Sequence, residues 1–339
     1  MTARTRHVFL GGIIIVALGL LAGFSAYLSG GMPAVAVAQE RPPEFRYVPV
    51  DASVVGFADV RGLMDSDLRD RLRGLESESQ SKDRLEFQER TGINIENDID
   101  RVVAGLVPNG SDQPRGIIVL TGRFDVDRLE ALALENGGTV SDYEGRRLIA
   151  MSRELGSRAE SDAEETPELT MAFVEPDILA LGSDEILRQV LDLPSDGDGV
   201  GGSEELMGLL RHVDDASTAW TIGRLDGRGV EGWIPNQMGS QILQMSAFAI
   251  GSQINGGISG TVMVETRDEA AGRNLHSLVQ GFMALARMQS NSRPEVARLI
   301  DSFRLEAVGI NLTLSFDLSS DLLLQLIPNN SETGSAGAN

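Results

Sequence analysis

The chain has no cysteine and a single lysine, Lys82. Without cysteine it forms no disulfide bonds and carries no lipid on a lipobox thiol. Small secreted domains usually need disulfide bonds to compensate for a small core, but about 290 residues bury enough apolar surface to fold without them. The missing cysteines therefore exclude a disulfide-stapled scaffold, and the hydrophobic content of 42% indicates a globular protein.

Positive charge is also scarce, because 29 Lys and Arg residues face 50 Asp and Glu residues. All the acidic residues follow the first 28 positions, so the rest of the chain carries 27 basic and 50 acidic residues, a formal charge of −23. A surface this negative repels nucleic acid and anionic lipid headgroups. The charge therefore predicts that nucleic acid is not a partner.

The most informative feature that is present is an uncharged apolar run at residues 8–28, directly behind Arg4 and Arg6. A helix of about 21 residues spans the roughly 30 Å hydrocarbon core of a bilayer, which favours a retained membrane anchor. The Ala-Val-Ala sequence at 36–38 is also typical of a signal-peptidase site. Basic residues before the run keep the N-terminus in the cytoplasm. We expect either a single-pass membrane protein with an extracytoplasmic C-terminal domain, or a periplasmic or secreted protein cleaved after Ala38.

Composition divides the chain into five parts. The Gly-, Pro- and Ala-rich sequence behind the apolar run is typical of a semi-extended spacer, and the last twelve residues have the composition of a disordered tail. The predicted parts are a signal-anchor or signal peptide at 1–28, a linker at 29–46, a first α+β half at 47–195, a second α+β half at 196–327 and a tail at 328–339.

Hydrophobic periodicity predicts the elements of the first half. Asp98 is placed to cap a helix, since Ile99, Val102, Val103 and Leu106 recur at helical spacing. The other expected elements are a strand at 53–60, a polar helix at about 63–90, a buried strand at 116–124, a helix capped by Asp125, hairpins at 139–151 and 169–182, and a helix capped by Ser183.

The second half repeats this order. We expect a short helix at 204–212, a strand at 219–225, a helical segment, a strand at 258–265, and a long helix that begins at Asp268. A final hairpin alternates apolar and polar residues along 312–318. The long helix is predicted to bury five apolar residues at helical spacing: Leu275, Leu278, Val279, Phe282 and Leu285.

The predicted fold class is α+β. Residues 116–132 and 257–275 share the order glycine, buried strand, acidic cap and amphipathic helix, which indicates two divergent halves. Consecutive hairpins favour mostly antiparallel sheet, covered by helices on one face.

Four segments resemble those of uncharacterised bacterial exported or membrane-anchored proteins. They are Tyr47–Val55, Thr91–Asp100, Gly122–Asp125 and Gly137–Gly145. The proteins of that group share an N-terminal apolar segment and a duplicated α+β body, and the resemblance covers most of the region after the linker. It implies an envelope location and this fold, and it implies no activity or catalytic residue.

No catalytic constellation or metal site is predicted. His212 and His276 are separated in sequence and lack an obvious carboxylate or serine partner, so a structural role is expected for each. The pattern Ser-x-x-Lys at 79–82 lacks the second lysine that a penicillin-binding enzyme needs. The loop at 196–204 has calcium-like acidic residues in a register that places Val200 at a ligand position. We therefore expect no cofactor and no enzyme activity.

One segment suggests a binding surface. No charged residue occurs between Glu231 and Glu265, in a chain that is 23% charged. The simpler interpretation is a buried helix followed by a central strand. The other is an apolar, Met-rich surface that accepts a lipid-like ligand or a partner. The candidate surface residues are Trp233, Met238, Ile242, Met245 and Phe248.

These observations predict a membrane-tethered or secreted extracytoplasmic domain with a non-enzymatic binding or scaffold role in the bacterial envelope. Its partners would be the membrane, through residues 8–28 if they are retained, and an envelope protein. The alternative is a carrier that holds a lipid-like or other apolar ligand in a cavity lined by residues 232–264.

Overall fold

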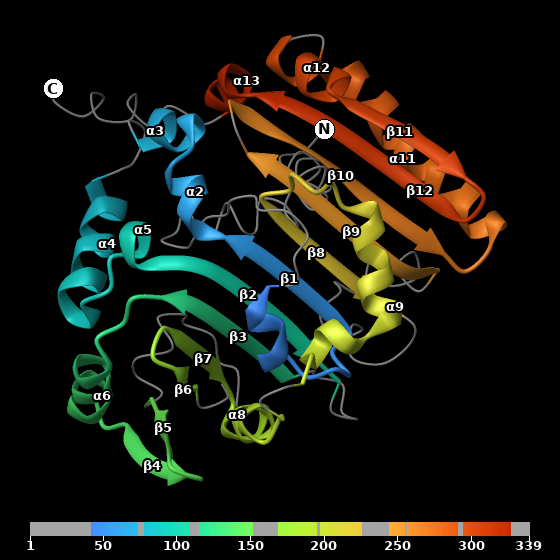
Figure 1. Ribbon diagram of the computed structural model, residues 1–339. Helices are drawn as coiled ribbons and strands as arrows, with labels where there is room; N and C mark the ends of the chain where they lie inside the picture. The colour runs from blue at the N-terminus through green and yellow to red at the C-terminus, as the bar shows by residue number, and fades with distance from the viewer. Residues whose placement is uncertain are drawn as a thin grey trace, which may run out of the picture.

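One continuous sheet runs through the whole structure. The computed structural model describes residues 42–73, 78–108, 115–151, 169–194, 197–225, 244–254, 256–290 and 294–326. Within them, 12 strands form a single sheet in which neighbours are antiparallel (Figure 1). In sheet order they are β11 (Phe303–Val308), β12 (Asn311–Ser319), β10 (Gly257–Thr266), β9 (Met245–Ile254), β8 (Ala219–Arg224), β1 (Val54–Asp59), β2 (Ile99–Val107), β3 (Arg115–Gly122), β7 (Ile178–Gly182), β6 (Thr170–Glu175), β5 (Arg146–Ala150) and β4 (Thr139–Tyr143).

Helices connect these strands and cover parts of both faces of the sheet. Within the described ranges, none is both long enough and apolar enough to cross a membrane. The helices are η1 (Pro43–Tyr47), α2 (Val60–Met64), α3 (Asp67–Arg73), α4 (Glu78–Thr91), α5 (Ile95–Asp98), α6 (Val126–Glu135), α8 (Asp184–Leu191), η2 (Gly199–Gly202), α9 (Glu204–Met207), η3 (Gly208–His212), α11 (Glu269–Gln289), α12 (Pro294–Asp301) and α13 (Ser320–Leu326).

The first and second halves of the chain meet at the middle of the sheet, where β1 pairs with β8. Each half begins with three strands that are neighbours in both sequence and space, β1-β2-β3 and β8-β9-β10. A helical connection then leads to the outer strands, and the last strand of each half returns to pair with the third, β7 with β3 and β12 with β10. The mixed α and β content and the antiparallel sheet agree with the predicted fold class.

Most predicted strands, hairpins and caps are present. The side chain of Asp125 accepts a hydrogen bond from the Arg128 amide at 3.1 Å, and that of Asp268 accepts one from the Ala271 amide at 2.8 Å. These carboxylates satisfy amides that the first turn of a helix leaves unpaired. Gly145, at φ +78°, closes the β4–β5 hairpin at its predicted place.

Three predictions of local structure are wrong. Residues 99–107 form strand β2 rather than a helix capped by Asp98. The prediction failed because both faces of the strand are apolar, so its sequence lacks the alternation that identifies a strand. The single helix expected at 63–90 is divided into α2, α3 and α4. The segment expected to be helical before residue 258 contains β9, which starts at Met245.

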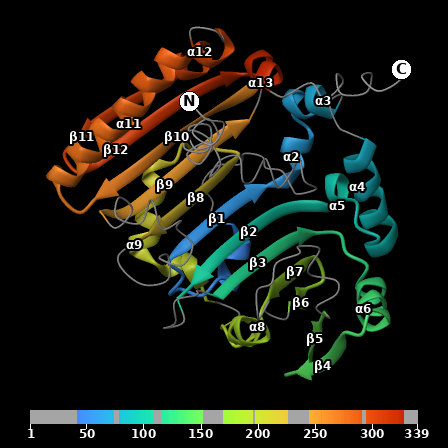
Figure 2. The ribbon, with the colours of Figure 1, turned by 180° about the vertical axis from the view of Figure 1, so that it is seen from behind.

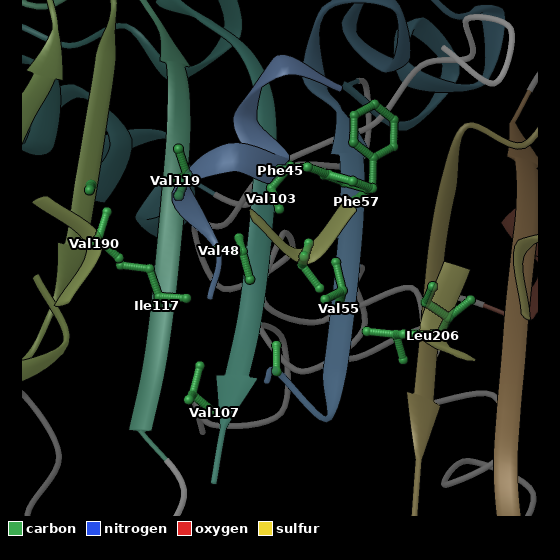
Figure 3. Close-up of a cluster of buried hydrophobic side chains, with 14 of the residues drawn as sticks. Phe45, Val48, Val55, Phe57, Val103, Val107, Ile117, Val119, Val190 and Leu206 are labelled. Carbon is green, nitrogen blue, oxygen red and sulfur yellow. The ribbon is translucent and has the colours of Figure 1, made fainter. Parts of the chain in front are cut away.

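The larger hydrophobic core lies on one face of the sheet, which we call the η1 face. It is defined by Val55 and Phe57 of β1 and Ile222 of β8, all at most 8% exposed. Residues of η1, α8, η2 and α9 cover this face, as Figure 1 shows for η1, α8 and α9. Figure 3 shows Phe45 of η1, Val190 of α8 and Leu206 of α9 among the side chains of β1, β2 and β3.

The opposite face, which we call the α11 face, also carries helices. Helix α6 contacts β4 and β5 there, and its Leu129 and Ala133 share a buried cluster with Leu120 of β3 and Leu179 of β7. Helix α11 lies over β12 and β11 (Figure 2). Helices therefore lie on both faces of the sheet, and the expectation that they cover one face is wrong. A twelve-stranded sheet with two apolar faces needs cover on both.

Candidate functional site

Away from the strand ends, the paired residues on the α11 face of the seven central strands include no charged residue. Residues that are paired across neighbouring strands point to the same side of a sheet. The pairing registers therefore assign the residues of this face between the strand ends, and these are all apolar, glycine, serine or threonine. Asp100 of β2 lies at a bulge between Ile99 and Arg101 and has no strand partner. They are Leu312, Leu314, Phe316 and Leu318 of β12; Ile258, Gly260, Val262 and Val264 of β10; Phe248, Ile250, Ser252 and Ile254 of β9; Ala219, Thr221 and Gly223 of β8; Val54, Gly56 and Ala58 of β1; Val102, Ala104 and Leu106 of β2; and Gly116, Ile118 and Leu120 of β3.

The middle of this uncharged face is less covered than the opposite side of the same strands. On the η1 face, Val55, Ile222 and Ala249 are completely buried. On the α11 face, Val54 and Ile250 keep partial exposure and Ile118 is 41% exposed. Figure 2 shows α11 and α6 toward opposite ends of the sheet, with β8, β1 and β2 between them.

Helix α11 adds a stripe of exposed apolar side chains at one side of this face. We call Leu278, Leu285 and Met288 the α11 stripe, and they are 39%, 36% and 72% exposed. The stripe lies beside the row that faces the sheet, in which Ala271 and Ala286 are buried and Leu275 and Val279 are partly buried. Phe282, on the same side of the helix as the stripe, is 48% exposed.

The stripe corrects the prediction that α11 buries all its apolar residues. Leu278, Phe282 and Leu285 were expected in the core and are exposed. An α-helix can press only one row of side chains onto a flat sheet. The apolar arc of α11 is wider than that row, so its second part remains at the surface.

The structure describes two of the five predicted surface residues. Met245 opens β9, pairs with Thr266 and is partly exposed. Phe248 lies in β9 on the uncharged face, with Val264 on one side and Gly223 on the other. Trp233, Met238 and Ile242 lie outside the described residues.

Other residues of this surface were not predicted, because they come from distant parts of the sequence. Val54, Leu106 and Ile118 belong to the first half of the chain and join Phe248 only through the β1–β8 pairing. The α11 stripe carried a usable signal, since its apolar residues extend beyond the width of one buried row. The strand residues carried none, because these strands are apolar on both sides, and a continuous apolar run does not show which side is covered.

The principal buried acids lie on the η1 face and have structural partners. Glu44 of η1 is completely buried, and its carboxylate accepts hydrogen bonds from Arg101 Nε at 2.7 Å and from Thr121 Oγ1. These bonds hold η1 on β2 and β3. Asp59, at the end of β1, is 6% exposed, and burial raises the pKa of its carboxyl group to about 6.

Within the described ranges, no three His, Asp or Glu side chains come close enough together to hold a metal ion. His212 ends η3, and burial lowers the pKa of its imidazole. His276 lies in α11 on the other side of the sheet. Apart from hydroxyl groups such as those of Thr221 and Ser252, the paired residues of the α11 face offer apolar contacts, so burial of apolar surface is the main interaction available to it.

Comparisons with known proteins give little further guidance. No protein-family model matches the chain, and the search of curated proteins found no relative. Among solved structures, crystal form I of TP0453 is similar, with a TM-score of 0.42 and 11% sequence identity over 83% of this chain and 95% of that one. A TM-score this low supports neither a shared fold nor a shared function.

Proposed function

We propose that this protein is a non-enzymatic binding domain of the bacterial envelope, and that it binds through the uncharged α11 face and the α11 stripe. The observation that carries the proposal is the difference between the two sides of the same strands. Val55 and Ile222 are 0% exposed on the η1 face, whereas Ile118 and the stripe residues on the other side are at least 36% exposed.

Burial of apolar surface supplies most of the free energy of association, at roughly 25 cal/mol per Å². Contiguous exposed apolar patches on soluble domains are typical of interaction sites. The chain as a whole is strongly charged, with 23% charged residues and a formal charge of −21. Against that background, a seven-strand face without charge is suited to an apolar partner.

The proposed location rests on the sequence. We infer that residues 8–28 hold the domain at the membrane if they are retained, and that cleavage after Ala38 would release it. In both cases the domain described here lies outside the cytoplasm. The strong negative charge favours solubility there and disfavours nucleic acid as a partner.

A second candidate function is the carriage of a lipid-like ligand. It is favoured by the chemistry of the surface, since side chains such as Val54, Leu106, Ile250 and Val262 offer dispersion contacts without any group that selects a polar partner. An acyl chain laid along these strands would meet only apolar and small side chains.

We also propose that the two halves arose by duplication. The support is their shared element order, a three-strand meander followed by a helical connection and a hairpin that returns to the third strand. The segments that suggested the duplication from sequence are β3 with α6 and β10 with α11.

Photo-crosslinking in cells tests the binding proposal. A benzophenone amino acid replaces Leu278 in the full-length chain, and Gln280 in a control chain. Gln280 is an exposed residue that lies about 200° around the same helix from Leu278. We expect an adduct from position 278 and none from position 280. A second substitution, Leu285→Glu, should remove the adduct, whereas Gln280→Glu should leave it.

The identity of the adduct separates the two functions. A discrete protein adduct at position 278 supports the binding or scaffold role. A lipid adduct detected by mass spectrometry supports the carrier. Equal crosslinking from positions 278 and 280, or none from either, contradicts both proposals.

A further inference from the structure

A small cavity lies on the η1 face, on the other side of the sheet from the α11 stripe. It has a volume of about 110 Å³. Since one water molecule needs about 10–15 Å³ of such space, the cavity has room for a small organic molecule. Its polar wall consists of Arg46, Tyr47, Arg146 and Glu175, and its apolar wall of Val174, Val190, Leu191, Leu193 and Pro194.

The charges in this cavity do not balance. Arg46 forms an ion pair with Glu175, and the Tyr47 hydroxyl group donates a hydrogen bond to the same carboxylate oxygen. Arg146 donates from Nη1 to the carbonyl oxygen of Val174, and no carboxylate of the described residues pairs with it. The lining therefore carries two guanidinium groups and one carboxylate, a net charge of +1, which is offset in part by Asp177, a nearby acid whose negative charge acts on Tyr47.

Arg46 has an unused donor. Its Nε atom is buried and has no hydrogen-bond partner among the described residues. A buried N–H group without an acceptor costs about 1–3 kcal/mol, so a rotation of the Arg46 side chain that turned Nε toward an anion in the cavity would recover that cost. Arginine pairs bind carboxylates well, because their planar donors match the two carboxylate oxygens.

We propose that this cavity binds a small monocarboxylate with a short apolar substituent. The carboxylate would lie between Arg46 and Arg146, and the substituent would contact the apolar wall at Val190, Leu191 and Pro194. Charge balance favours a monoanion, since one guanidinium charge remains after Glu175 is counted. The same chemistry occurs in a free branched-chain acid and at the C-terminus of a peptide that ends in leucine.

Calorimetric titration of the full-length chain in a nonionic detergent tests this proposal. The probes are isovalerate, the uncharged isovaleramide of the same shape, inorganic phosphate, acetyl-Gly-Leu and its C-terminal amide. We expect saturable binding of isovalerate and none of isovaleramide or phosphate at the same concentrations. Binding of acetyl-Gly-Leu but not of its amide would identify a peptide C-terminus as an accepted source. Binding of isovalerate alone would identify a free acid.

Substitutions on neighbouring residues provide matched controls. Arg146→Met should weaken isovalerate binding at least tenfold, whereas Arg147→Met should not change it, since Arg147 pairs with Glu130 of α6 on the other side of the sheet. Glu175→Gln should strengthen binding about threefold or more, because it frees Arg46 from a competing carboxylate. Unfolding midpoints of all variants confirm that each is folded. Equal binding of isovaleramide, or unchanged affinity in both Arg146→Met and Glu175→Gln, would overturn the proposal.

Discussion

The stability of this protein should depend on one buried acid, Asp59. Burial raises the pKa of its carboxyl group from 3.8 to about 6. Between these values the folded state keeps a proton that the unfolded state has lost, so the free energy of unfolding falls as pH rises from about 4 to about 6 and is then constant. At 1.36 kcal/mol for each tenfold change in proton affinity, the loss is on the order of 3 kcal/mol.

Asp59→Asn should remove this dependence. The amide carries no charge at any pH, and its oxygen can still accept the hydrogen bond from the Arg61 backbone that Asp59 accepts. We expect the variant to match the wild-type protein at pH 4 and to exceed it in stability at pH 7. Urea unfolding at both pH values measures the difference, and Asp51→Asn, at an exposed turn position, serves as the control. Parallel pH profiles for wild type and Asp59→Asn would contradict the assignment.

Two glycines of the uncharged face should respond oppositely to alanine. A Cβ atom on Gly223 would lie 2.5 Å from the ring of Phe248 and 3.0 Å from Val54 Cγ2, whereas one on Gly116 would meet nothing within 4 Å. Gly223→Ala should cost about 1–3 kcal/mol, because the ring must move. Gly116→Ala should be neutral or stabilising by up to about 1 kcal/mol, since it restricts the unfolded chain. Denaturant midpoints compare the two, and equal losses would show that Phe248 adjusts freely.

At the scale of elements, the sequence predicts turns and helix caps better than it predicts which faces of the strands and helices are covered by other elements. The hairpin at Gly145 and the caps at Asp125 and Asp268 are confirmed, because turn and cap chemistry depends on a few neighbouring residues. Strand β2 was mistaken for a helix, because two apolar faces conceal the strand period.

The same limit applies to the candidate surface. Periodicity identifies the apolar side of α11. The part of that side that contacts the sheet depends on how α11 crosses β12 and β11, and the local sequence does not determine this crossing. The contribution of Val54, Leu106 and Ile118 depends on the pairing of β1 with β8, between residues about 170 positions apart. Neither could be derived from the sequence alone.

The capping of α11 gives a prediction at this scale. Asp268→Ala removes the acceptor for the Ala271 amide and a negative charge beside the helix N-terminus. The expected cost is about 1 kcal/mol of unfolding free energy. Asp317→Ala, at an exposed position of β12, should change stability by less than about 0.5 kcal/mol. Guanidinium unfolding of both variants tests the difference, and an equal effect would mean that the cap contributes little.

At the scale of the whole molecule, the two halves should unfold together. A single hydrophobic core on the η1 face includes Phe57 from the first half and Ile222, Ala249 and Met263 from the second. Trp220, which stacks on Phe57 at a ring-centroid distance of 5.6 Å, reports on their junction.

Trp233→Phe leaves Trp220 as the only tryptophan, because the chain contains two. In that background, fluorescence and far-UV circular dichroism should give one coincident unfolding transition. Ile222→Ala should lower both midpoints together, with a loss of about 2–5 kcal/mol. Two separate transitions would show that the halves are independent domains.

The β1–β8 pairing also has a consequence for synthesis. Val54 pairs with Leu106 on one side, but its neighbour on the other side, Gly223, follows about 170 positions after it. Until β8 leaves the ribosome, the outer edge of β1 therefore presents unpaired amide and carbonyl groups in what will become the centre of the sheet. Such an edge is a template for any extended chain nearby. Fragments that end before Ala219 keep that template permanently and are expected to associate through it, whereas the complete chain closes it with its own second half.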